Sequence, residues 1–116
     1  MTMRISEYEF GKIAIENETY TSDVIISPEQ VIDSWRRKQG HNLGITDLDD
    51  IMKAKPDVLI IGTGYYGRMQ VADETRQYLE EQGIKVRQAK TGDAVTEFNA
   101  MQKENTRVVA ALHLTC

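Results

Sequence analysis

The sequence predicts an α/β fold in which a mostly parallel sheet carries helices and is extended by antiparallel strands from the N-terminal third. Three observations lead to this prediction. Strand-like patterns crowd the first third of the chain, whereas the remainder alternates helix and strand. The stretch 57–61 is an apolar run after its first residue, typical of a central strand covered on both faces. It leads into a glycine-rich turn, and consecutive strand–helix–strand units are normally parallel and right-handed.

The N-terminal third is typical of antiparallel sheet. Residues 12–16 alternate polar and apolar side chains with the period of a half-buried strand. Asn17 and Glu18 are expected to form a hairpin turn, after which residues 19–21 return with β-favouring types. Residues 23–26 are a further short predicted strand.

Residues 27–40 fit two interpretations. The stretch Ser27 to Gln30 has the pattern of a capping box, with a proline inside it, that opens a helix ending near Gly40. Against this, positions 31, 33 and 35 also follow the period of a strand. The sequence leaves helix and strand open here. It also leaves Trp35 open between core and contact surface, because a large amphipathic side chain serves in both.

Boundaries are clearer from Gly44 onward. Thr46 is predicted to cap a short helix that runs through Ala54, with Asp49 in its first turn. Pro56 ends this helix, because the residue before a proline is pushed out of the α region. The central strand 57–61 follows.

The rest of the chain continues the alternation. A helix is predicted over 71–82 with Gly83 in the C′ position, and a strand over 84–88. Thr91 is predicted to cap a third helix, whose apolar residues 94, 95, 98 and 101 share one face. The last strand, 107–114, is rich in apolar residues and is expected to be central.

Composition and charge narrow the function classes. The chain has 14 basic and 18 acidic side chains, a formal net charge of −4, and no long basic stretch, so no nucleic-acid partner is predicted. Its single cysteine, Cys116, cannot form an internal disulfide. The sequence shows no signal-peptide core and no apolar run long enough to span a bilayer. These features predict a cytoplasmic protein without membrane insertion, folded as one domain over residues 1–116.

The motif Gly62-Thr63-Gly64-Tyr65-Tyr66-Gly67 matches the G-x-G-x-x-G pattern of dinucleotide-binding folds. That pattern needs an acidic residue about 20 positions on, at the end of the next strand, where this chain has Arg87 to Lys90. Two other interpretations compete with it. The glycines serve as a tight turn between the strand and its helix, or they form an anion or ligand site at the carboxyl end of the strand. The candidate residues of such a site are Gly62, Thr63, Gly64, Tyr65, Tyr66 and Arg68.

Other candidate chemistry is sparse. His113 and Cys116 lie three residues apart, and pairs of cysteine and histidine can catalyse acyl transfer. However, side chains at that spacing on an extended strand point to opposite faces. His41 lies in a polar loop, where a surface role is expected. Asp47, Asp49 and Asp50 are best explained by a helix N-terminus, where carboxylates are favoured. Two histidines and one cysteine, scattered along the chain, do not make a zinc site, and no cofactor or metal is predicted.

Several segments of the chain resemble, in the same order along the sequence, those of one protein family. They are residues 57–64, the helix around 74–79, residues 83–86, residues 94–99, residues 112–116, and the stretch from Trp35-Arg36 into its following loop. Together these segments resemble the domain-of-unknown-function 498 family, also called Mth-938-like. The resemblance implies a three-layer α/β fold with a mixed central sheet and additional N-terminal strands. It supplies no catalytic residue. Eukaryotic members include a mitochondrial factor that assists assembly of respiratory complex I and a cytosolic protein linked to adipogenesis.

Two function hypotheses follow. The first is a non-catalytic module for protein interaction or assembly, with a protein partner and with Tyr65, Tyr66 and Trp35 as candidate contacts, because aromatic anchors dominate interface energetics. The alternative is a small-molecule or anion-binding protein, or an enzyme, with its site at the Gly62–Gly67 turn. Self-association as a homo-oligomer is compatible with so small a chain, although no sequence feature specifies it.

Overall fold

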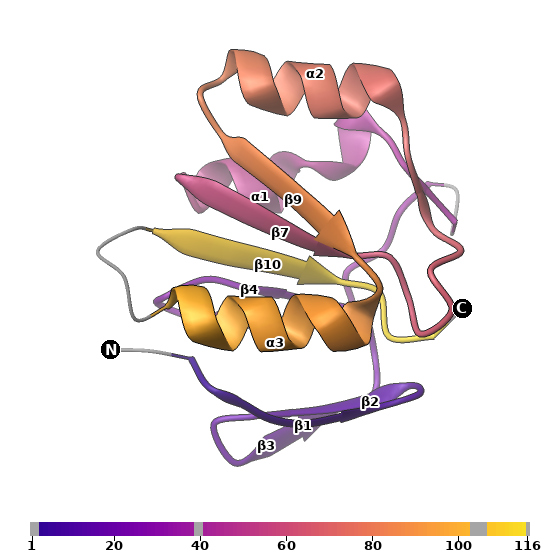
Figure 1. The fold of residues 1–116 in the computed structure, drawn as a ribbon, viewed down its shortest axis with the longest axis vertical. Helices are drawn as coiled ribbons and strands as arrows, with labels where there is room; N and C mark the ends of the chain where they lie inside the picture. Colours follow the sequence, from indigo (N-terminus) through magenta and orange to yellow (C-terminus); the bar gives the residue numbers. More distant parts are fainter. Residues whose placement is uncertain (1–2, 39–40, 103–106, 116) are drawn as a thin grey trace.

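A five-stranded mixed sheet forms the centre of the computed structural model, which describes residues 3–38, 41–102 and 107–115 (Figure 1). In spatial order its strands are β5 (Val31–Ile32), β4 (Val24–Ile26), β10 (Val108–Leu112), β7 (Val58–Gly62) and β9 (Lys85–Ala89). Strands β10, β7 and β9 run parallel, β4 is antiparallel to β10, and β5 is antiparallel to β4. The predicted mixed, mostly parallel sheet is confirmed.

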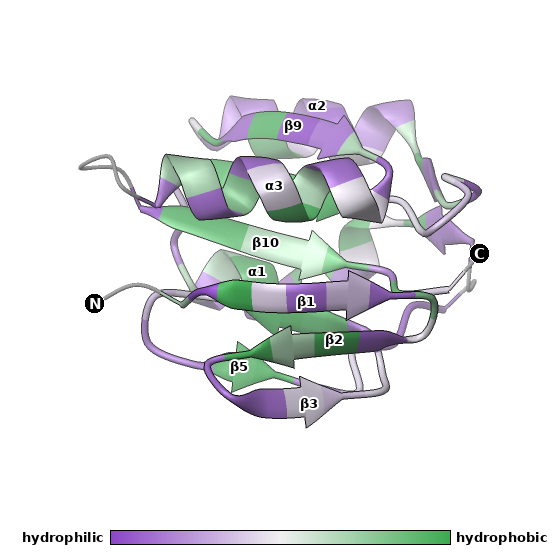
Figure 2. Cartoon of the chain, turned by 60° about the horizontal axis from the view of Figure 1, so that its bottom comes forward, coloured by the Kyte–Doolittle hydropathy of each residue, from purple (hydrophilic) through white to green (hydrophobic). Residues whose placement is uncertain are grey.

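Strands β7 and β10 are the buried middle of this sheet. Every residue of both strands is buried. Figure 2 shows the contrast between apolar β10 and the largely hydrophilic β9 and α2 (Asp73–Glu81) at the edge of the molecule. The segments that became β7 and β10 were both predicted as central strands. The structure confirms this, with boundaries shifted by one or two residues.

One face of the sheet is covered by α3 (Thr91–Met101) and by a separate three-stranded antiparallel sheet (Figures 1 and 2). The strands of this sheet are β1 (Ile5–Glu9), β2 (Lys12–Ile15) and β3 (Glu18–Tyr20). Ile13 from β2 and Phe98 from α3 meet Ile60 and Ala110 of the central sheet in one core. A large aliphatic or aromatic side chain contributes about 1.5–3 kcal/mol when fully buried.

The other face is covered by α1 (Asp49–Lys53), α2 and the 3₁₀ helix η1 (Ile45–Asp47), with a two-stranded parallel pair of β6 (Asn42–Leu43) and β8 (Gln70–Val71). Leu48 and Leu79 pack there against Leu59 and Ile61. Successive residues of β7 therefore enter opposite cores, because side chains alternate along a strand. The result is the three-layer α/β fold that the family resemblance implied.

The stretch 27–40 is not helical in its described part. Only Val31–Ile32 is a strand, so the strand interpretation holds for two residues and the helix interpretation is wrong. Ser27 closes a turn instead of capping a helix: its Oγ accepts the Gln30 N–H at 3.3 Å, and its own N–H donates to Gln30 O at 2.9 Å. The turn lets β5 pair back on β4. Trp35 is 6% exposed and belongs to the core, so it is not an exposed contact.

Two predicted helix caps are also wrong. Thr46 lies inside η1, whose N-cap is Gly44, and α1 follows as a separate helix from Asp49. Asp47 organises this start, because its Oδ2 accepts the Gly44 N–H at 2.9 Å. Thr91 is the first residue of α3 rather than its cap, and its hydroxyl bonds elsewhere.

Two further boundaries move for local reasons. The helix predicted over 71–82 begins only at Asp73, because Gln70–Val71 pairs with β6, while Gly83 takes the predicted C′ position with φ of 81°. The turn between β2 and β3 consists of Glu16 and Asn17, one residue earlier than predicted. Both residues have positive φ, 48° and 71°, as a tight two-residue hairpin of this twist requires.

Candidate functional site

The glycine segment Gly62–Gly67 begins at the carboxyl end of β7 and continues as a loop rather than as a helix. Residues 63–69 form this loop, the short strand β8 follows, and α2 begins at Asp73. A dinucleotide site needs a helix to open at the glycines so that its N-terminus faces the pyrophosphate. The segment lacks that geometry. The prediction of a tight turn leading directly from the strand into its helix is also wrong, because a loop and β8 separate β7 from α2.

The glycines have identifiable packing roles. A Cβ atom on Gly62 would lie 2.8 Å from both Leu112 Cδ2 and Thr91 Oγ1, so β7 approaches β10 and the start of α3 too closely for any side chain. Gly64 and Gly67 adopt φ of 110° and 73°, which L-residues rarely take. Close packing and backbone conformation account for these three glycines.

Most backbone donors of the loop are bonded within the chain. The N–H groups of residues 63, 64 and 65 donate to Ala89 O (2.9 Å), Thr91 Oγ1 (2.8 Å) and Thr115 O (2.6 Å), respectively. Met69 N–H donates back to Thr63 O at 3.0 Å. A backbone anion site needs such N–H groups to converge on the ligand. The Gly67 N–H also donates to Gly64 O at 3.2 Å, so five of the loop's seven donors are already engaged.

An exposed group of aromatic rings projects from the same loop. Tyr65 and Tyr66 are 47% and 58% exposed, and Phe10, from the turn between β1 and β2, is 48% exposed. Their centroids lie 5.1 Å apart for the two tyrosines, 5.8 Å for Phe10 and Tyr65, and 6.0 Å for Phe10 and Tyr66. We call Phe10, Tyr65 and Tyr66 the aromatic cluster. Half-buried Tyr8 extends it inward, 6.2 Å from the Tyr65 ring.

Phe10 was missed by the sequence reasoning. The chain places it far from the glycine loop, and only the packing of the β1–β2 hairpin beside that loop brings the rings together. The hairpin is joined to the end of the chain, because Gly11 N–H donates to Leu114 O at 2.9 Å. Gly11 indicates a turn directly after Phe10, but nothing in the local sequence indicates what that turn packs against.

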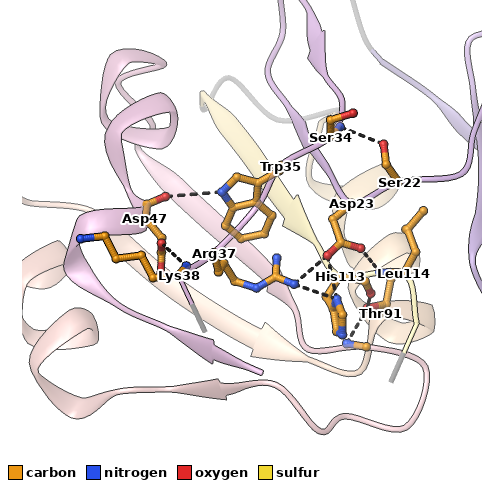
Figure 3. A network of polar contacts seen from close by, with 11 residues as sticks. Ser22, Asp23, Ser34, Trp35, Arg37, Lys38, Asp47, Thr91, His113 and Leu114 are labelled. Atoms are coloured by element: carbon orange, nitrogen blue, oxygen red, sulfur yellow. Dashed lines mark hydrogen bonds and ion pairs between the residues drawn. The ribbon is translucent and has the colours of Figure 1, made fainter. Parts of the chain in front are cut away.

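A buried polar network lies at the same edge of the sheet (Figure 3). Asp23 Oδ2 accepts hydrogen bonds from Arg37 Nη2 at 2.7 Å and from His113 Nδ1 at 2.8 Å, while its Oδ1 accepts the Leu114 N–H at 2.8 Å. The side chains of Arg37 and His113 are only 4% and 7% exposed. The Arg37 guanidinium also lies 4.7 Å from the centroid of the Trp35 ring, within range of a cation–π contact.

The charge of Asp23 determines that the Nδ1 atom of His113 carries a hydrogen. Burial raises the pKa of Asp23, but the hydrogen bonds from His113, Leu114 and Arg37 outweigh it and hold that pKa below its usual range. Since the carboxylate is then ionised and only accepts, His113 Nδ1 is the donor. Arg37 Nη2, 3.0 Å from Nδ1, therefore directs its hydrogen to Asp23 rather than to the ring. The network ties the residue before β4 to the loop after β5 and to the end of β10.

Thr91 connects this network to the glycine loop. Its hydroxyl donates to His113 O at 2.6 Å and accepts the Gly64 N–H at 2.8 Å. Tyr8 makes a parallel connection, because its hydroxyl donates to Leu114 O at 2.9 Å. Burial raises the pKa of Tyr8 to about 12. The exposed rings are thus mounted on a hydrogen-bonded base at the carboxyl edge of the parallel strands.

The other candidate residues take varied positions. Thr63 is buried, and its hydroxyl donates to Ala89 O at 3.1 Å, whereas Arg68 is exposed. His41 is exposed, and its ring packs at 5.7 Å against His113. The hypothesis of a pair between His113 and Cys116 falls outside the described residues. Across 3–38, 41–102 and 107–115, no group of three or more His, Cys, Asp or Glu residues could hold a metal ion.

Comparison with solved structures shows the same fold in other proteins. A conserved hypothetical protein from Pyrococcus horikoshii OT3 superposes with a TM-score of 0.87 at 25% identity, over 98% of this chain and 100% of that chain. A Mth938-like domain from Bordetella pertussis gives 0.71 at 19% identity over 97% and 85%. A Bartonella henselae protein described as an outer membrane protein gives 0.82 at 24% identity over 98% and 96%. In the present chain, no described helix is long and apolar enough to cross a membrane.

The sequence itself matches one family model along most of its length. The matched residues are 5–113, and they include every strand and helix of the central sheet and of both covering layers. The resemblance expected from the ordered segments is therefore confirmed: this chain belongs to the DUF498/DUF598 family of proteins of unknown function.

Proposed function

We propose that this chain is a non-catalytic protein-interaction module that binds its partner through the aromatic cluster. The observation that carries the proposal is the cluster itself. Three large rings, each about half exposed, are gathered at one point of the surface. Contiguous exposed apolar surface of this kind marks interaction sites in soluble proteins. Aromatic side chains are also the residues that most often dominate binding energy at interfaces.

The packing of the rings supports a binding role further. Tyr65 and Tyr66 are held edge to face, with 73° between their planes, and Phe10 meets Tyr65 at 67°. The rings are thus ordered before any partner arrives. Their hydrogen-bonded base includes the Tyr65 N–H, which donates to Thr115 O. Binding through preordered side chains avoids part of the conformational entropy that association costs.

The alternative, a ligand site in the glycine loop itself, has less support. Five of the loop's seven N–H donors are bonded to the chain, and its glycines are needed for packing. Ring centroids only 5–6 Å apart also leave no space between the rings for a cationic guest. The outward surface of the rings is what remains available to a partner.

The test compares the wild type with the double variant Tyr65→Ser/Tyr66→Ser in affinity capture from a lysate of the source organism, quantified by mass spectrometry. A protein held by the wild type should be lost by the variant, because removing interface anchors worth about 2 kcal/mol or more lowers affinity about thirtyfold. Ile45→Ser is the matched control, since Ile45 is an exposed apolar residue on η1, on the other side of the sheet. Equal capture by wild type and double variant contradicts the proposal.

A further inference from the structure

Two cationic residues lie in or against the loop that carries the tyrosines of the aromatic cluster. Arg68 is exposed and follows Tyr66 by two residues in the same loop. Lys90, also exposed, lies over Gly67: its Cγ and Cε atoms are 3.1 Å and 3.5 Å from the position of a Cβ on that glycine. Neither residue forms an ion pair with any other residue that the structure describes. The lysine stem therefore lies against the loop that carries the rings, and its ammonium group has no ion-pair partner within the described part of the chain.

On the hairpin side of the cluster, the charged residues nearest to Phe10 in the sequence are paired with each other. Lys12 lies 3.7 Å from Glu9, so the two charges that flank Phe10 compensate each other. The chain as a whole carries a net charge of −4. Arg68 and Lys90 consequently bring two positive charges to the loop of Tyr65 and Tyr66, on a protein that is acidic as a whole.

We propose that the aromatic cluster, together with Arg68 and Lys90, binds an acidic segment of a partner protein that carries an apolar anchor residue. This inference rests on the proposed function and specifies the partner's chemistry. The apolar anchor covers the rings, and carboxylates beside it face the guanidinium and the ammonium. Complementary charges of this kind mainly raise the association rate and select among partners.

A second copy of this chain fits the surface poorly. A closed symmetric dimer places the same patch on both subunits face to face. A two-fold axis through the cluster would set the loop that carries Arg68 and Lys90 against the partner's β1–β2 hairpin, where the Glu9 carboxylate is already paired with Lys12. Charge complementarity therefore favours a different, acidic partner.

Single-stranded nucleic acid also combines negative charge with a preference for aromatic surfaces, but it fits less well than a protein segment. Bases stack on ring faces that stand open to them. Here the rings pack edge to face on one another, at 73° for Tyr65 and Tyr66. Two cations on a chain of net charge −4 also fall short of the basic groove that tracks a phosphate backbone.

The experiment selects peptides from a random phage-displayed library on the immobilised wild-type protein. A synthetic peptide of the enriched sequence is then titrated by fluorescence polarisation. The proteins compared are wild type, Arg68→Glu/Lys90→Glu, Tyr65→Ser/Tyr66→Ser and a matched charge control, Lys53→Glu/Lys85→Glu, whose lysines lie away from the loop in α1 and β9. We expect enrichment of Asp or Glu beside an apolar residue. The Kd should rise about tenfold or more in the Arg68/Lys90 variant and stay within about twofold in the control. The wild-type protein should also bind the peptide more weakly as the salt concentration rises from about 0.05 M to about 0.5 M.

The outcomes separate this inference from the proposed function. If the tyrosine variant loses the peptide but charge reversal at Arg68 and Lys90 has no effect, the acidic-segment inference is wrong and the interaction surface stands. If neither variant loses it, both are wrong. Selection of basic or uncharged peptides, or of none, also overturns the inference. So does tighter binding of a random single-stranded oligonucleotide, or a concentration-dependent dimer that the tyrosine variant abolishes in sedimentation experiments.

Discussion

Two groups of side chains share the carboxyl edge of the parallel strands, and they are built in opposite ways. The network of Asp23, Arg37 and His113 is largely buried, charged and joined by short hydrogen bonds to Asp23. The aromatic cluster is exposed, uncharged and held only by ring contacts and the backbone beneath it. A buried charge is costly unless it is paired, so we expect the loss of one partner in this network to destabilise the fold. Half-exposed rings contribute little to stability, so their presence is better explained by binding.

The largest effect is expected from Asp23→Ala. This change removes the carboxylate that accepts from Arg37, His113 and the Leu114 N–H, and it leaves the Arg37 charge buried beside a cavity. Breaking one partner of a buried ion pair typically costs about 3–5 kcal/mol. Urea unfolding at neutral pH measures the loss in the free energy of unfolding. Asp33→Ala, at an exposed aspartate, is the control and should change that free energy by less than about 0.5 kcal/mol. A loss of under about 1 kcal/mol for Asp23→Ala would show that the network is not a structural centre.

An intermediate effect is expected from Gly62→Ala, at the joint between the two groups. The new Cβ would meet Leu112 Cδ2 and Thr91 Oγ1 at 2.8 Å, so the end of β10 or the start of α3 has to move. Overpacking of this kind costs about 1–3 kcal/mol. Gly92→Ala tests the same chemical change one residue after Thr91, where no atom lies within 4 Å of the added carbon. In the first turn of α3 alanine should be neutral or stabilising, because glycine is a poor helix former. Equal thermal unfolding curves for the two variants would contradict the packing role assigned to Gly62.

Sequence patterns could predict the sheet far better than they could predict this edge. The run 57–61 and the apolar stretch 107–114 had enough periodicity and length to be recognised as central strands. Ser27 and Thr91 were misjudged for a shared reason. Each has a hydroxyl in a context typical of a helix cap, but that hydroxyl bonds to a turn in one case and to two distant segments in the other. Tertiary hydrogen bonds of this kind leave no local trace.

The same limit applies to the candidate site. Tyr65 and Tyr66 could be selected because they stand beside a recognisable motif. Phe10 and Asp23 could not, since each acquires its neighbours only when the chain folds: Asp23 lies 90 positions from His113 in the sequence. In the sequence His113 is a candidate only together with Cys116, a pair that their spacing disfavours, and nothing local indicates its hydrogen bond to a carboxylate from the N-terminal third of the chain.

The smallest effect is expected from Tyr66→Ser, and it completes the comparison. Tyr66 is 58% exposed and its ring contacts are confined, among the described residues, to Phe10 and Tyr65, so little apolar area returns to water when it is removed. The free energy of unfolding should change by no more than about 0.5 kcal/mol, the usual range for surface substitutions. Urea unfolding of the wild type and the variant under identical conditions measures the difference. A loss near that of Asp23→Ala would mean that the rings are part of the structural core of this edge, and the argument that they are kept for a partner would fail. A loss within the expected range, combined with weakened binding of the selected peptide, would separate the two groups by function. The buried charges would stabilise this edge of the sheet, and the exposed rings would bind the partner.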